Sequence, residues 1–165
     1  PSLTGGVAAA IAEAYARAGE LGARPFRLII DVGGDDAGAT ALGRFSAAIA
    51  AGPHALWYVV NPYRSLTPGA AEALAVLGEV EAKARLRATA LVANAHLKAD
   101  TDAAVVARAL PAADEAARAA GLPLAFATAP KRLARQELDE LSAQVPGAFV
   151  YPVEVVVRTP WETES

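Results

Sequence analysis

Cysteine is absent from the 165-residue chain, and lysine occurs only at positions 83, 98 and 131, against twelve arginines. Without cysteine there is neither a disulfide framework nor a thiolate metal site. The formal net charge is −3, so the chain has no basic surplus for binding nucleic acid. No apolar run approaches membrane-spanning length, and the first residues lack the layout of a signal peptide. We therefore expect a soluble cytoplasmic protein with no membrane or nucleic-acid partner.

Two kinds of segment alternate along the chain, which is 54% hydrophobic and long enough for one domain with a real core. Short runs rich in Val, Ile, Leu and aromatic residues predict strands at 26–32, 55–61, 88–94, 123–128 and 148–157. Alanine-rich stretches with helical spacing predict helices at 4–21, 36–51, 68–86, 101–120 and 132–144. The first four strands are nearly continuous in apolarity, which is typical of strands buried on both faces of a parallel sheet.

This alternation predicts a single α/β domain over residues 1–165, with a layered, mainly parallel sheet flanked by helices. Helix signals support it, because Thr67 precedes Pro68 as an N-cap and Thr101 with Asp102 opens the next helix. We expect a kink or break at Pro111. Gly121 ends the same helix. The last strand contains a proline and mixed polarity, so we expect it at an edge of the sheet or as an irregular extension.

Four predicted strands end in polar loops, whose sequences are "DVGGDD", "NPYRSLT", "NAHLKADT" and "TAPKR". In parallel sheets ligands bind at the carboxyl ends of the strands, so these loops predict a binding edge. The alternative for any single loop is that its asparagine only tolerates a turn and caps a helix.

Asp31 and Gly34 form the pattern D-x-x-G directly after a predicted buried strand. In phosphate-handling α/β proteins an acid at this place holds Mg²⁺, usually through water, and the glycine amide approaches a terminal phosphate. Alone this pattern has many chance matches. Asp35 and Asp36 have a simpler role as helix caps that favour the helix dipole.

The stretches "IIDVGGDDAGATALGRFS", "WYVVNPYRSLT" and "ALVANAHLKADT" resemble the later part of a bacterial family of P-loop ATP-binding proteins related to the MinD/ParA class. The opening "PSLT" is similar to the segment that precedes the Asp-Val-Gly-Gly strand in that family. The resemblance covers residues 1 to about 128. It implies a P-loop NTPase-like fold, binding of ATP with Mg²⁺, possible ATP hydrolysis and homodimer formation.

Transferred by position, the resemblance makes Asp31 the Mg²⁺-associated acid of the Walker B motif, with Gly34 at the terminal phosphate and Gly33 among the nucleotide-binding residues. It makes Asn94 the residue that hydrogen-bonds the adenine edge. Ala129 and Pro130 fall where the class presents a loop against the base. A family signature of unassigned role matches Asn61, Pro62, Arg64 and Thr67. Arg64 could contact phosphate or a partner subunit, or be a solvated side chain of a helix-entry loop.

The chain departs from this family because it contains no G-x-x-x-x-G-K-[ST], and none of its three lysines follows a glycine. The first strand, the P-loop, the first helix and the second strand of the family lie upstream of its "PSLT"-like segment. Their loss would leave the remaining strands with unpaired edges. We expect the chain to be a fragment of a larger nucleotide-binding domain. The alternatives are a partner chain that supplies the missing half, and a truncated homologue that acts as a binding or scaffold module without catalysis.

Other function classes have less support. His54 and His96 have no second ligand at a spacing useful for a metal. A serine hydrolase would need G-x-S-x-G, and a dinucleotide-binding domain would need G-x-G-x-x-G after its first strand. A receiver-like signalling domain would use Asp31 as phosphoacceptor and Lys131 after a later strand. Its acidic pair should precede Asp31, however, whereas Asp35 and Asp36 follow it.

Overall fold

The computed structural model describes residues 4–18, 27–33, 36–64, 67 and 69–154. The elements follow in the order α1 (Thr4–Ala18), α2 (Asp36–Gly43), α3 (Ser46–Ala50), β1 (Trp57–Val60), α4 (Ala70–Ala84), β2 (Ala90–Ala93), a short 3-10 helix η1 (Lys98–Asp100), α5 (Ala103–Ala120), β3 (Leu124–Pro130), α6 (Arg135–Ser142) and β4 (Phe149–Val153). The chain divides into two compact units. We call them the N-terminal unit (Pro1–Leu56 with Gly78–Arg87) and the sheet unit (Trp57–Leu77 with Ala88–Ser165).

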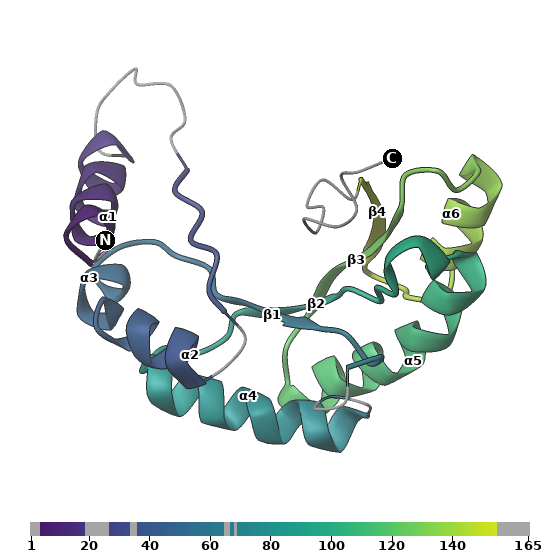
Figure 1. Ribbon diagram of the computed structural model, residues 1–165, viewed down its shortest axis with the longest axis horizontal. Helices are drawn as coiled ribbons and strands as arrows, with labels where there is room; N and C mark the ends of the chain where they lie inside the picture. Colours follow the sequence, from purple (N-terminus) through teal and green to yellow (C-terminus); the bar gives the residue numbers. More distant parts are fainter. Residues whose placement is uncertain (1–3, 19–26, 34–35, 65–66, 68, 155–165) are drawn as a thin grey trace, which may run out of the picture. The chain divides into compact units, whose positions relative to one another are not determined.

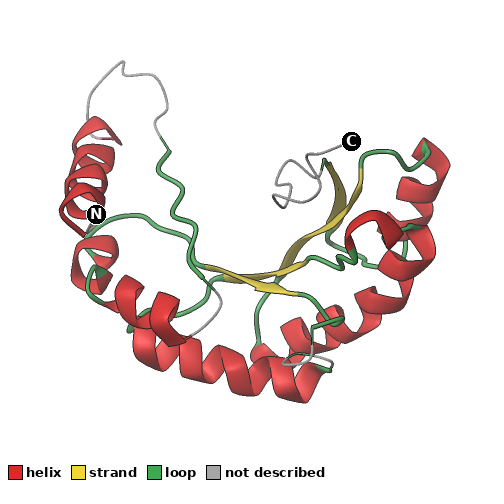
Figure 2. Cartoon of the chain, viewed as in Figure 1, coloured by secondary structure: helices red, strands yellow, loops and turns green. Residues whose placement is uncertain are grey.

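The sheet unit contains a four-stranded sheet in the order β1-β2-β3-β4, and every neighbouring pair is parallel (Figure 2). The α/β class and the parallel sheet flanked by helices are therefore confirmed. Each crossover between strands carries a helix, as parallel strands require. β4 lies at one edge and includes Pro152, which agrees with the expectation of an edge strand there.

One face of this sheet is covered by helices, with α5 packed on β2 and β3 and α6 packed on β4 (Figure 1). The core between these layers is built largely from alanine and branched aliphatic side chains. Its largest fully buried members include Leu91 on β2 and Leu110 and Val106 on α5. Alanine lets the helices approach the sheet closely, while the few large side chains fill the remaining space.

The opposite face of the sheet carries aromatic side chains, and no described helix of the sheet unit packs on it. Phe126 of β3 lies at its centre, with its ring centroid 5.4 Å from Trp57, 5.6 Å from Phe149 and 6.3 Å from Tyr151. Trp57, Phe149 and Tyr151 are 54–55% exposed. We call these four residues the aromatic face. Parallel sheets normally bury both faces, so this surface is unusual for the fold.

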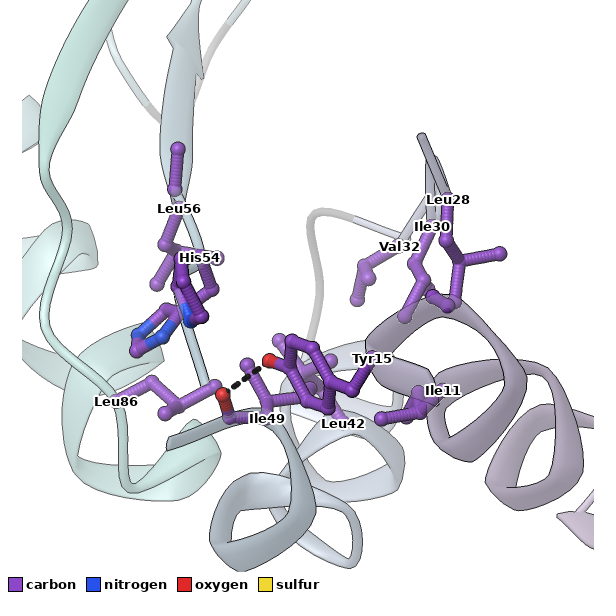
Figure 3. Close-up of a pocket in the computed structure, with 13 residues that line it drawn as sticks. Ile11, Tyr15, Leu28, Ile30, Val32, Leu42, Ile49, His54, Leu56 and Leu86 are labelled. Atoms are coloured by element: carbon purple, nitrogen blue, oxygen red, sulfur yellow. Dashed lines mark hydrogen bonds between the residues drawn. The ribbon is translucent and has the colours of Figure 1, made fainter. Parts of the chain in front are cut away.

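The N-terminal unit has its own small core, in which Ile11 of α1, Leu42 of α2 and Ile49 of α3 pack with Ala84 and Leu86. Tyr15 joins this core, and its hydroxyl donates to the carbonyl of Ile49 (Figure 3).

Residues 27–33 are not part of any sheet, so the strand predicted at 26–32 is wrong over its described residues. Ile29 in this stretch is 88% exposed. A strand needs a neighbour to take up its backbone hydrogen bonds, and none of the described strands pairs with this stretch. Apolar sequence alone therefore did not suffice to form a strand here.

The predicted helices are confirmed, with changes at their ends and one division. The segment predicted at 36–51 forms two helices, α2 and α3. α5 continues through Pro111, so no break occurs there. Pro111 lies on the exposed side of α5, where water can satisfy the carbonyl that lacks its amide donor. Asp102 caps α5 by accepting from the amide of Val105 at 2.7 Å, and Gly121 ends it with a φ of 67°.

Candidate functional site

Polar side chains gather at the carboxyl edge of the sheet unit, where the loops after β1, β2 and β3 lie next to one another. Asn94 directly follows β2 and is half-buried. Its backbone amide donates to the carbonyl of Val60 at 2.8 Å, and its side-chain Oδ1 accepts from the hydroxyl of Thr128 at 2.6 Å. The side-chain NH₂ group of Asn94 has no partner among the described residues, so it remains a donor at this edge.

Asn61 ties the loop after β1 to the loop after β2. Its Nδ2 donates to the carbonyl of His96 at 3.1 Å, and its Oδ1 accepts from the amide of Tyr63 at 3.1 Å. The phenol of Tyr63 continues the connection by donating to the carbonyl of Val105 at 2.8 Å. The structure therefore gives Asn61 a definite role in holding two loops together, which the sequence pattern left unassigned.

Thr67 and Arg64 complete the loop after β1. The hydroxyl of Thr67 donates to the carbonyl of Asn61 at 3.0 Å, and α4 begins only at Ala70, so Thr67 is not the N-cap that the sequence predicted. The backbone of Arg64 forms the turn, since its amide donates to Asn61 and its carbonyl accepts from Thr67. The guanidinium is exposed and meets no described partner, so it is available to an anion or to another protein.

Pro130 and Asn94 line the same shallow hollow, with His96, Thr101 and Arg132 around them. The hollow has a volume of about 20 Å³. That space holds little more than one water molecule, so a purine base would enter only after side chains move. The neighbouring Ala129 also lines this hollow, although it is only 1% exposed and packs in the core of the sheet unit.

Arg132 and Thr101 shape the loop that borders this hollow. Thr101 is 1% exposed, and its hydroxyl accepts from the amide of Leu97 at 2.8 Å while donating to the carbonyl of Lys98 at 2.9 Å. Arg132 donates to the carbonyls of Ala99 and Thr101. The sequence analysis did not single out Arg132 or Thr128, because an arginine or threonine after a strand carries no distinctive pattern.

Asp31 and Gly33 belong to the N-terminal unit, where both lie in the extended stretch 27–33 and both are exposed. The carbonyl of Gly33 lies against α2, since a Cβ on Gly38 would come within 2.1 Å of that oxygen. Gly34 and Asp35 lie outside the described residues, as does the side chain of Asp36. Of the predicted site residues, the structure thus brings Asn61, Asn94 and Pro130 together at one edge.

The N-terminal unit also contains an apolar cavity of about 350 Å³, which the sequence analysis did not anticipate. Leu28, Ile30 and Val32 line one side of it, and Tyr15 and Ile11 of α1 line another (Figure 3). Alternate residues of the stretch 27–33 therefore face the helices of this unit, while Ile29 faces away. His54 contributes a polar ring at the rim, with its Nδ1 3.0 Å from the carbonyl of Gly52.

Among the described residues, no three His, Asp or Glu side chains gather closely enough to hold a metal ion. Lys131, the lysine of the receiver-like alternative, is exposed and pairs with Glu154 at 3.1 Å.

None of the described helices is long and apolar enough to cross a membrane. No protein-family model, curated protein or solved structure matches the chain.

Proposed function

We propose that this chain is part of an ATP-binding, P-loop NTPase-like protein, to which it contributes the base-contacting loops and a Walker B-type acid. The observation that carries the proposal is the arrangement of Asn94 and Pro130 beside one hollow at the carboxyl edge of a parallel sheet. This edge is where α/β sheets bind their ligands.

Asn94 is the residue through which a purine base would be recognised. The hydroxyl of Thr128 occupies its Oδ1, which orients the side-chain NH₂ group as a donor. A purine ring offers acceptor nitrogens to such a donor. Asn61 supports this recognition indirectly, because it holds the loops after β1 and β2 in place.

Asp31 is the residue that would hold Mg²⁺ through water, and the exposed position of its carboxylate is compatible with that role. The described residues do not by themselves fit a Mg²⁺-nucleotide complex. They contain no metal-binding cluster, and no lysine of the chain stands in a P-loop pattern. Tight ATP binding and any hydrolysis therefore require a P-loop from another segment or from a partner chain, and we assign no catalytic step to this chain alone.

Nuclear magnetic resonance of the isotope-labelled chain tests the base-contacting half directly. We expect ATP and adenosine to shift the resonances of the Asn94 side-chain amide and of the backbone of residues 95–101 and 128–132. The dissociation constant should be about 1 mM or higher. Cytidine is the matched control and should shift them less. Asn94→Ala should remove the response. Purine-induced shifts that appear elsewhere, or none at millimolar adenosine, would contradict the proposal.

The intact mass of the protein purified from its native source decides how the phosphate-binding half is tested. If the mass is above 16.8 kDa, the phosphate-binding half is tested on that longer chain. In that chain Mg²⁺-ATP should raise the melting temperature, and Asp31→Ala should abolish the Mg²⁺-dependent part of the rise. If the mass is near 16.8 kDa, the next step is to look for a co-purifying chain that carries a P-loop. Unchanged Mg²⁺-dependent stabilisation in Asp31→Ala would remove the Walker B-type assignment.

The aromatic face supports a second candidate function, that of a binding or scaffold module without catalysis. Trp57, Phe149 and Tyr151 expose more than half of their surfaces on one side of the sheet. Exposed apolar patches of this kind commonly mark protein interaction sites. If this function is correct, Trp57→Ser should abolish partner binding while Asn94→Ala leaves it unchanged.

A further inference from the structure

Arg132 borders the hollow beside Asn94, and both residues belong to the sheet unit. Its Nη2 donates to the carbonyl of Ala99 at 2.9 Å and also to the carbonyl of Thr101. Thr101 is 1% exposed, so one end of the guanidinium is anchored to a buried residue. These contacts link the loop after β3 to the loop after β2 and hold the guanidinium in place.

The backbone that carries Arg132 is fixed on both sides. The amide of Lys131 donates to the carbonyl of Val153 on β4 at 2.8 Å. The amide of Leu133 donates to the carbonyl of Pro130 at 3.1 Å and closes a short turn. A side chain that is already ordered loses little conformational freedom when a ligand arrives, so Arg132 is suited to binding.

The positive charge of Arg132 has no counter-charge within the described part of the chain. No described carboxylate forms an ion pair with it, and none of the residues that line the hollow is acidic. A ligand that enters the hollow therefore meets an uncompensated cation. Electron-rich partners, either an anion or the face of an aromatic ring, are attracted to such a group.

The hydrogen bonds of Arg132 distinguish between these two partners. A guanidinium binds phosphate best through two parallel N–H groups, and each such pair includes one N–H of Nη2. Nη2 has two hydrogens, and the carbonyls of Ala99 and Thr101 accept from it. Neither pair remains complete for a phosphate. The two faces of the guanidinium plane are unaffected, because its hydrogen bonds lie within the plane.

We propose that an adenine ring stacks on the guanidinium plane of Arg132, which makes Arg132 a second base-binding residue beside Asn94. The inference rests on the proposed function and deepens it. Asn94 donates to an acceptor nitrogen in the plane of the ring, while Arg132 contacts the π face. Because a guanidinium is weakly hydrated, covering its face with a ring costs little.

The small volume of the hollow requires a side chain to move when the ring enters. The imidazole of His96 lines the hollow and forms no hydrogen bond with a described residue. It can therefore turn away while Arg132 stays in place.

Ring-current shifts in the wild-type chain test the stacking directly. Protons above an aromatic ring shift upfield, whereas protons in its plane shift downfield. On titration with adenosine, we expect the Nε–H and Hδ protons of Arg132 to shift upfield while the side-chain amide of Asn94 also responds. If Asn94 responds and the Arg132 protons shift downfield or not at all, the stacking is overturned and the proposed function stands. If neither residue responds, both fail.

Two alanine variants provide a second test. Arg132→Ala should raise the dissociation constant for adenosine about fivefold. Lys131→Ala is the matched control and should leave it unchanged, since Lys131 pairs with Glu154 and does not line the hollow. Equal affinity of the two variants for adenosine overturns the proposal. A loss seen with ATP but not with adenosine also overturns it, because it assigns Arg132 to a phosphate.

Arg132→Ala also removes the hydrogen bonds to Ala99 and Thr101, and so alters the loop. The upfield shift in the wild-type chain therefore decides between stacking and a purely structural role, which would not produce it.

Discussion

The hydroxyl of Thr128 donates a 2.6 Å hydrogen bond to Oδ1 of Asn94, and so joins β3 to the end of β2. Both side chains are half-buried, which makes the bond harder for water to replace. We expect Thr128→Val, which keeps the shape but removes the hydroxyl, to lower the free energy of unfolding by about 1–2 kcal/mol. Thr128→Ser keeps the donor and is the matched control. Urea unfolding measures both, and equal losses in the two variants would show that the hydrogen bond is not the cause.

Asn61 should be more important for loop order than for the sheet itself. Asn61→Ala removes the hydrogen bonds to His96 and Tyr63, and we expect a loss of about 1–3 kcal/mol in the free energy of unfolding. Amide hydrogen exchange should speed up in residues 61–64 and 96–101 while β2 and β3 stay protected. Asn61→Asp keeps the acceptor for Tyr63 and loses the donor, so it should have an intermediate effect. Unchanged exchange in residues 96–101 would contradict the tie between the loops.

Replacing glycine by alanine should have opposite effects on the free energy of unfolding at Gly38 and at Gly78. A Cβ at Gly38 would lie 2.1 Å from the carbonyl oxygen of Gly33, so Gly38→Ala must displace backbone and should cost about 1–3 kcal/mol. Gly78 lies inside α4 with no heavy atom within 4 Å of such a Cβ. Gly78→Ala should therefore add about 1 kcal/mol through helix propensity. Thermal unfolding of both variants checks this, and stabilisation by Gly38→Ala would refute the close approach of Gly33 to α2.

We expect the buried phenol of Tyr58 to make the folded protein less stable at alkaline pH. Burial raises the pKa of its phenol above 10.0, and the hydroxyl donates to the carbonyl of Ala73 at 3.1 Å. The unfolded state therefore releases this proton at a lower pH than the folded state does. The contribution is fully present below pH 10 and is lost as the pH rises through the folded-state pKa. Tyr58→Phe should flatten the decline in unfolding free energy above pH 10, and an unchanged slope would exclude this cause.

Much of the architecture could be predicted from local sequence. Strands β1 to β4 and the helices that connect them were expected close to where they occur, because apolar runs and helical spacing act within each segment. The N-terminal cap of α5 at Asp102 and the end of that helix at Gly121 depend on only a few neighbouring residues, and both were predictable for that reason. Residues 26–32 have an equally apolar pattern, yet the described part of them forms no strand, because strand formation also needs a partner.

The amino-acid sequence by itself determined the α/β class, the mainly parallel sheet and the polar loops at the strand ends, since periodicity and turn residues specify these locally. Only the tertiary structure decided which polar groups serve the fold. It assigned Asn61 to a tie between loops and left the NH₂ group of Asn94 as a donor. It also revealed the aromatic face. These features depend on which segments become neighbours across long stretches of chain, and no local pattern encodes that.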